Sequence, residues 1–192
     1  MVGILPLCLV LIATRLTLGN DDAIYQFFLT YRLEHTNLTT AVLLFSELGN
    51  PALYILYGTI YWKARQRHDA KTKRFVLGYV LVQVLIAFLV ARILKIGIGR
   101  PRPDIGGPYT PWTLDHGHNS MPSGHTTEIV GGAVPLSFFF RNAALPFLTG
   151  AYIALLGFSR IYLGMHHVGD IFFGIVLGSV SAYLIFTLWN RE

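Results

Sequence analysis

Long apolar runs separated by short polar segments dominate the pattern along the chain. A helix that crosses the hydrocarbon core of a bilayer needs about 20 mostly apolar residues, and six stretches approach that length. These six stretches are residues 2–18, 38–62, 75–94, a run from just after His125 to about residue 140, 143–159 and 168–189. The pattern therefore predicts an all-α polytopic membrane protein, with about six transmembrane helices and one membrane-embedded domain over residues 1–192.

Three segments add detail to this prediction. The first run could be a signal peptide, but it lacks a charged n-region and an evident small-residue cleavage site, so we expect a retained helix. Residues 21–36 mix charged and apolar positions and predict an amphipathic helix at the membrane interface. The second run contains Glu47, Asn50 and Pro51, which predict a kink. Glu47 and Asn50 either form a satisfied polar pair there or line a lipid entry cleft.

Composition supports the membrane assignment. Hydrophobic residues make up 53% of the chain and charged residues 13%, with a mean hydropathy of +0.52. Soluble domains usually carry about a quarter charged residues. The net charge of +5 is concentrated in residues 63–74, where six cations face one acid, so membrane topology explains it better than nucleic-acid binding. Cys8 is the only cysteine, which excludes a disulfide framework and a thiolate metal site.

The positively charged segment also orients the chain. Cationic loops remain on the cytoplasmic side, so residues 63–74 are predicted to be cytoplasmic. Counting predicted spans from there places residues 95–125 and 160–167 outside and both termini in the cytoplasm. All polar segments with reactive side chains therefore face the same, extracytoplasmic surface.

Those segments carry the groups that phosphoryl transfer requires. They are residues 95–103, 122–125 and 159–170. A transferring phosphoryl group carries negative charge on its oxygens, and Lys95, Arg102 and Arg160 can stabilise that charge. The Ser123 hydroxyl and the Gly124 N–H can add donors at a predicted helix N-terminus, which favours anions.

Two histidines and one carboxylate supply the remaining chemistry. His166 and Asp170 are four residues apart, so on a helix they share a face. The carboxylate can accept a hydrogen bond from the imidazole Nδ1–H, leaving Nε2 to attack phosphorus and form a phosphohistidine. His125 can protonate the leaving oxygen and later activate water. His167, three residues from Asp170, is nearly as good a nucleophile by spacing alone.

The three segments resemble the signature of the type 2 phosphatidic acid phosphatase family, K-x6-R-P, P-S-G-H and S-R-x5-H-x3-D. Every defined position matches, and the helical layout resembles the integral membrane branch of that family. The resemblance implies that His166 is the nucleophile, that Asp170 orients it and that His125 is the general acid. It implies phosphate ligands at Lys95, Arg102, Ser123, Gly124 and Arg160. Arg100 fits no family position.

The resemblance implies a metal-independent phosphatase, without an organic cofactor, acting on a lipid phosphate or pyrophosphate. The predicted topology places its site at the outer face of the membrane, and the compactness of the chain favours a bacterial inner membrane. Candidate substrates are undecaprenyl pyrophosphate, phosphatidylglycerol phosphate, phosphatidic acid and lipid A 1-phosphate. The expected partners are the substrate and membrane lipids, with no nucleic acid and an open oligomeric state. A lipid phosphotransferase and a non-catalytic lipid phosphate flippase remain alternatives.

A metal-dependent hydrolase is a further alternative. Histidine and carboxylate side chains that could bind zinc occur at Asp115, His116, His118, His125, His166, His167 and Asp170. The neighbouring cations disfavour this reading, because they would repel a metal dication.

Overall fold

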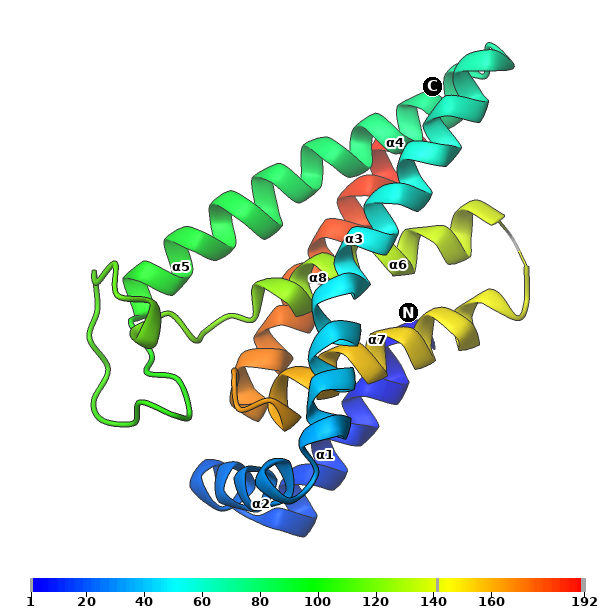
Figure 1. Cartoon of the computed structure of the whole chain (residues 1–192). Helices are drawn as coiled ribbons and strands as arrows, with labels where there is room; N and C mark the ends of the chain where they lie inside the picture. The colour runs from blue at the N-terminus through cyan, green and yellow to red at the C-terminus, as the bar shows by residue number, and fades with distance from the viewer. Residues whose placement is uncertain (1, 141, 191–192) are drawn as a thin grey trace.

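Helices make up nearly all of the architecture in the computed structural model, which describes residues 2–140 and 142–190. The α-helices are α1 (Leu5–Leu18), α2 (Asp21–Glu34), α3 (Thr36–Gln66), α4 (Ala70–Val82), α5 (Ala91–Ile98), α6 (Gly124–Phe140), α7 (Leu145–Tyr162) and α8 (Val168–Trp189). Two short 3₁₀ helices are η1 (Val2–Ile4) and η3 (His116–His118), and a π-helical segment, η2 (Gln83–Val90), joins α4 to α5. The described residues contain no strand, so the predicted all-α class is confirmed (Figure 1).

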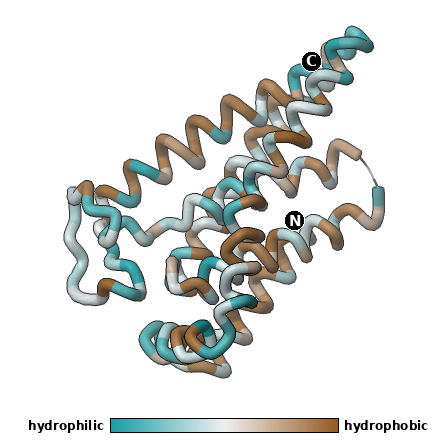
Figure 2. The backbone as a smooth tube through the Cα atoms, viewed as in Figure 1, coloured by the Kyte–Doolittle hydropathy of each residue, from teal (hydrophilic) through white to brown (hydrophobic). Residues whose placement is uncertain are grey.

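Four helical segments are long and apolar enough to cross a membrane: α3, the continuous segment Ala70–Ile98, α7 and α8. Apolar residues follow their lengths, and polar residues gather near their ends (Figure 2). The protein is therefore an integral membrane protein. Helices α1 and α6, with 14 and 17 residues, are shorter than a typical span, so the number of six stays a prediction.

The predicted interfacial helix corresponds to α2. Gly19, with a φ of 88°, turns the chain after α1, and the Asn20 side chain accepts a hydrogen bond of 2.8 Å from the Ala23 N–H. Ile24 and Phe28 are buried on one face, whereas Phe27 is exposed. In Figure 1, α2 lies beside the end of α1. Its burial pattern is amphipathic, as the sequence predicts.

Helix α3 continues through Pro51, so the polar segment at residues 47–51 does not divide it into two helices. Asn50 is buried there, and its amide donates to Glu128 Oε2 on α6 at 2.6 Å. Asn50 is therefore satisfied by α6 and does not pair with Glu47.

Helices α6 and α8 form a tightly packed pair at the centre of the molecule. A Cβ atom on Gly174 would lie 2.8 Å from the Ser123 carbonyl oxygen, and one on Gly178 would lie 2.6 Å from Val130 Cβ. Small residues at such positions allow membrane helices to approach closely. The approach places the first turn of α6 beside the first turn of α8, where Ser123 N–H donates to the Asp170 carbonyl oxygen at 3.0 Å.

Replacing Gly174 by alanine should lower the thermal stability of the detergent-purified protein. The added methyl would overlap backbone, and such overpacking typically costs about 1–3 kcal/mol. Gly58→Ala on α3 is the matched control, because no atom lies within 4 Å of its added Cβ and alanine favours the helix. Thermal unfolding followed by circular dichroism measures both. Equal melting temperatures for Gly174→Ala and the parent would contradict the packing described for α6 and α8.

Candidate active site

The fold brings the three polar segments together at one end of the bundle. The loop after α5 reaches the beginning of α6, and the α7–α8 connection lies next to both (Figure 1). Ser120 N–H donates to the Arg100 carbonyl oxygen at 3.0 Å, and Arg100 contacts Asp170 at 2.8 Å. Residues separated by long stretches of sequence therefore form one site.

Cationic side chains reach this site from three elements. Lys95 lies in the last turn of α5, and its Nζ donates to the Asn119 carbonyl oxygen at 2.8 Å. Arg102 follows α5, and its Nε donates to the His116 carbonyl oxygen at 3.1 Å. Arg160 is buried near the end of α7, where its Nε has no hydrogen-bond partner. Donors that remain available on such cations can bind phosphate oxygens.

The beginning of α6 adds neutral donors. Ser123 is fully buried, and its Oγ accepts a hydrogen bond from Thr126 Oγ1 at 3.0 Å. Gly124 is the first residue of α6, and a Cβ there would lie 3.8 Å from Lys95 Cε. The N-terminus of a helix is favourable for an anion, and here it adjoins a lysine side chain.

His166 does not lie on α8. The helix begins at Val168, with His167 as its N-cap, so His166 belongs to the preceding connection. The prediction that His166 and Asp170 share a helix face is therefore wrong, because the cap interaction starts the helix two residues later. The two side chains still approach each other: His166 Nδ1 lies 3.7 Å from Asp170 Oδ2. This separation is longer than a hydrogen bond, and Nδ1 has no partner.

Burial sets the charge of the His166 imidazole, which is 3% exposed. Loss of solvation and the positive charges of Lys95 and Arg102 together lower its pKa to about 3, although Asp170 opposes the shift. The imidazole is therefore neutral at physiological pH. A neutral imidazole retains the lone pair that nucleophilic attack requires.

His167 has a different environment. Its backbone N–H donates to Asp170 Oδ2 at 2.8 Å, and its ring Nε2 lies 3.1 Å from the Pro101 carbonyl oxygen. The ring is thus engaged with the backbone of the loop after α5. Both rings lack a hydrogen-bond partner at Nδ1. His166 Nδ1 lies 3.7 Å from Asp170 Oδ2, and His167 Nδ1 lies 3.7 Å from Asp21 Oδ2. The two histidines that spacing alone did not separate therefore differ in their carboxylate neighbour and in the contact of His167 Nε2 with the loop.

Asp170 is completely buried, and both of its oxygens have partners. Oδ1 accepts from Arg100 Nη1 at 2.8 Å, and Oδ2 accepts from Ser120 Oγ at 2.5 Å and from the His167 N–H at 2.8 Å. These contacts fix the orientation of the carboxylate. Arg100 has no place in the sequence signature, and only the folded structure pairs it with Asp170.

A second carboxylate, that of Glu47 on α3, lies on the other side of the site. Its Oε1 is 2.8 Å from Arg160 Nη1, and its Oε2 is 3.9 Å from Nε2 of His125 in the first turn of α6. The Glu47 side chain is 50% exposed, whereas that of Arg160 is 6% exposed. The sequence pointed to Glu47 only as part of the polar segment within α3. It did not indicate that Glu47 pairs with Arg160.

The described residues contain no group of three or more histidine, cysteine or acidic side chains placed to hold a metal ion. Two of the histidine and carboxylate positions considered as zinc ligands pair instead in the loop after α5, where His118 Nδ1 lies 2.9 Å from Asp115 Oδ2. Hydrogen bonds from His118 and from the Gly117 N–H lower the pKa of the Asp115 carboxyl.

A comparison with models of protein families shows which family has this site. The model of the PAP2 superfamily matches residues 75–192. The chain belongs to the PAP2 superfamily. Every candidate site residue from Lys95 to Asp170 lies inside the PAP2 match, which confirms the family resemblance. Asp21 and Glu47 lie outside it, on helices that precede the matched segment.

Individual PAP2 relatives act on lipids according to their names. A lipid A 1-phosphatase from Rhizobium etli is 28% identical over 133 residues, which cover 67% of this chain and 56% of the relative. A lipid A 4'-phosphatase from Porphyromonas gingivalis is 31% identical over 129 residues, which cover 64% of this chain and 55% of the relative. The chain thus spans little more than half the length of these two proteins.

A solved PAP2 structure shares the fold. The transmembrane PAP2-type phosphatidylglycerolphosphate phosphatase from Bacillus subtilis superposes with a TM-score of 0.65 and 21% sequence identity. The match covers 100% of this chain and 99% of that chain. The helical arrangement described above is therefore that of a transmembrane PAP2 protein.

Proposed function

We propose that this protein is a metal-independent lipid phosphatase that removes the terminal phosphate of a lipid phosphate or lipid pyrophosphate through a phosphohistidine intermediate. The observation that carries the proposal is the neutral, buried His166 imidazole between the fixed Asp170 carboxylate and cationic side chains. Membership of the PAP2 superfamily and the lipid phosphatases among its relatives support the proposal.

In the first step, Lys95, Arg102 and Arg160 bind the phosphate oxygens, aided by Ser123 and the Gly124 N–H. His166 Nε2 attacks phosphorus, and the bond between phosphorus and the leaving oxygen breaks. Burial and the nearby Arg160 lower the pKa of His125 to about 4, so the negative charge of the bound phosphate must first favour its protonation. Protonated His125 then transfers this proton to the leaving oxygen, so the lipid product leaves neutral at that position. Asp170 accepts a hydrogen bond from His166 Nδ1–H, which requires the present 3.7 Å separation to shorten.

In the second step, water replaces the lipid product. His125, now neutral, takes a proton from this water as its oxygen attacks phosphorus. The bond between phosphorus and Nε2 breaks, and the electron pair returns to the His166 ring. Inorganic phosphate leaves, and both histidines regain their initial protonation states. Cations that stabilise charge in the transition state lower the barrier to each step.

The proposed location is a bacterial inner membrane, with the site at the outer face and both termini in the cytoplasm. The cationic α3–α4 connection and the loop after α5 lie at opposite ends of the long α4–α5 rod (Figure 1). If the positively charged end is cytoplasmic, the site faces outward. Substrates in that leaflet include undecaprenyl pyrophosphate, phosphatidylglycerol phosphate, phosphatidic acid and lipid A 1-phosphate.

The detergent-purified protein should release inorganic phosphate from at least one of these four lipids with EDTA present. No divalent ion takes part in the proposed steps, so chelation should leave the rate unchanged within about twofold. Vanadate, which adopts the five-coordinate geometry of the transition state, should inhibit competitively. A colorimetric phosphate assay and chromatography of the lipid products measure these outcomes.

Each alternative gives a different result in this assay. A phosphotransferase would yield a phosphorylated lipid acceptor instead of free phosphate. A flippase would bind the lipid and release nothing. A metal-dependent hydrolase would lose activity in EDTA and regain it with zinc. Any of these outcomes would contradict the proposed function.

A further inference from the structure

The Arg100 guanidinium lies between two carboxylates from distant parts of the chain. Its Nη1 is 2.8 Å from Asp170 Oδ1, and its Nη2 is 2.8 Å from Asp21 Oδ2. The Arg100 side chain is largely buried, at 14% exposure. It packs over the start of α8, because a Cβ on Gly169 would lie 3.2 Å from Arg100 Nη1. A planar guanidinium can bind two carboxylates at once through separate N–H groups.

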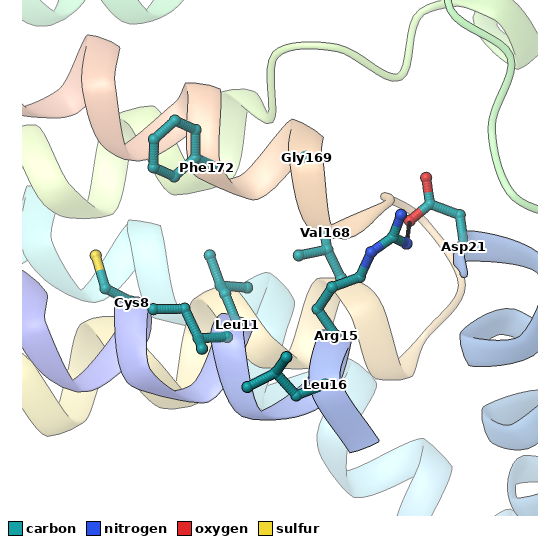
Figure 3. Close-up of a pocket in the computed structure, with 9 residues that line it drawn as sticks. Cys8, Leu11, Arg15, Leu16, Asp21, Val168, Gly169 and Phe172 are labelled. Atoms are coloured by element: carbon teal, nitrogen blue, oxygen red, sulfur yellow. Dashed lines mark hydrogen bonds and ion pairs between the residues drawn. The ribbon is translucent and has the colours of Figure 1, made fainter. Parts of the chain in front are cut away.

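Asp21 is itself held in place. It is the first residue of α2, and its Oδ1 accepts from Arg15 Nη1 of α1 at 2.9 Å. Figure 3 shows the Arg15 side chain extending toward Asp21 beside Val168 and Gly169 of α8. Positive and negative groups therefore alternate from the surface to the buried site in the order Arg15, Asp21, Arg100 and Asp170.

We propose that Arg100 is a positioning residue of the phosphatase site and that Asp21 of α2 holds Arg100 for this task. The inference rests on the proposed function, because it assigns Arg100 to the residue that orients His166. It extends the functional unit to α1 and α2, which precede the segment matched by the PAP2 family.

The physical argument begins with Asp170, whose carboxylate is inaccessible to solvent. A buried charge without an opposite charge beside it is unfavourable, so the carboxylate would bind a proton or rotate if Arg100 were absent. Arg100 occupies Oδ1, which leaves Oδ2 directed toward Ser120, the His167 N–H and His166. Protonation or rotation of the Asp170 carboxylate would remove the charged acceptor that fixes the His166 tautomer.

A direct role in phosphate binding fits the geometry of Arg100 less well. Both terminal nitrogens already contact carboxylates, which any phosphate oxygen would have to displace. A lysine would supply the charge but not the planar pair of donors that joins Asp21 to Asp170. The two roles predict different kinetics, because a positioning residue affects turnover whereas a phosphate ligand also affects substrate affinity.

The experiment measures kcat and KM for Arg100→Met, Arg100→Lys and Asp21→Asn in detergent, using the lipid that the unaltered protein hydrolyses best. Arg100→Met should lower kcat by about 100-fold and change KM by less than about threefold. Arg100→Lys and Asp21→Asn should each lower kcat by about tenfold. Asp22→Asn is the matched control, because Asp22 is the exposed next residue of α2 and should behave like the parent.

A double variant tests whether Arg100 acts through Asp170. Adding Arg100→Met to Asp170→Asn should slow the reaction by less than about threefold, because the carboxylate it positions is already gone. A full 100-fold further loss, or a large rise in KM with kcat intact, would overturn the inference. If Arg100→Met does not fold, as judged by size-exclusion chromatography, Arg100→Lys and Asp21→Asn decide the matter by the same criteria.

The result also separates this inference from the proposed function. An active parent with an unimpaired Arg100→Met variant would overturn the positioning role alone. A parent that releases no phosphate from any of the four lipids would overturn the proposed function and, with it, this role.

Discussion

Replacing His166 by alanine should reduce phosphate release by at least about four orders of magnitude, while the protein still inserts and folds. The proposed phosphohistidine cannot form without the imidazole. The neighbouring His167 cannot substitute, because its ring Nε2 lies 3.1 Å from the Pro101 carbonyl oxygen and its backbone N–H donates to Asp170 Oδ2. The cations and the α6 N-terminus would still bind the lipid, so KM should change far less than kcat.

The matched control is His167→Ala, which retains the backbone N–H that donates to Asp170. Its rate should remain within about tenfold of the parent, since the ring loses only its contact with the Pro101 carbonyl oxygen and a 3.7 Å approach to Asp21 Oδ2. Rapid acid-free denaturation after mixing with phosphorus-32-labelled lipid should trap labelled protein in the parent and none in His166→Ala. If His166→Ala retained activity and His167→Ala lost it, the nucleophile assignment would be reversed.

Asp170→Asn should lower kcat by about three to four orders of magnitude, by analogy with the loss of the buried aspartate in a serine protease triad. The carboxylate accepts from Arg100 on one side and from Ser120, with His166 Nδ1 nearby, on the other. An asparagine amide must present N–H₂ to one of these donors. It therefore loses an ion pair or favours the His166 tautomer whose lone pair points away from phosphate.

Asp115→Asn provides the matched control for this prediction. Like Asp170, Asp115 pairs with a histidine nearby in the sequence. Its contact with His118, three residues away, is 2.9 Å, which is shorter than the 3.7 Å between Asp170 and His166. The Asp115 pair is in the exposed part of the loop, so its loss should change kcat by less than about threefold. Steady-state phosphate release measures both variants. Equal losses in the two would show that Asp170 has no special role.

Hydrophobic runs predicted the helices well because membrane helices must satisfy their backbone internally and cover their surfaces with apolar side chains. Residues 168–189 coincide with α8, and residues 75–94 lie within the segment formed by α4, η2 and α5. The apolar run did not indicate that η2 within it would be π-helical. Polar residues within α3 suggested a bend, but the sequence did not indicate that Asn50 is satisfied by Glu128.

The candidate site was predictable as a group of residues, because counting membrane crossings places all three segments on one side. The contacts between them were not predictable. Arg100 and Asp21 are 79 residues apart, and Arg160 and Glu47 are 113 apart, so each pair depends on how the helices pack. The prediction that His166 shares a helix face with Asp170 failed for a local reason. Four-residue spacing indicates a shared face only if both residues lie in the helix, and α8 begins after its N-cap, His167.

The pairing of Glu47 with Arg160 has a consequence for substrate binding and product release. In the proposed reaction, a lipid phosphate that binds Arg160 through Nη1 replaces the Glu47 carboxylate 2.8 Å away, whereas the unpartnered Nε is open to it directly. After the proposed hydrolysis, Glu47 can return to Nη1 as inorganic phosphate departs. Glu47 would then compete with the product for this nitrogen, which would favour rapid release of phosphate and weak product inhibition.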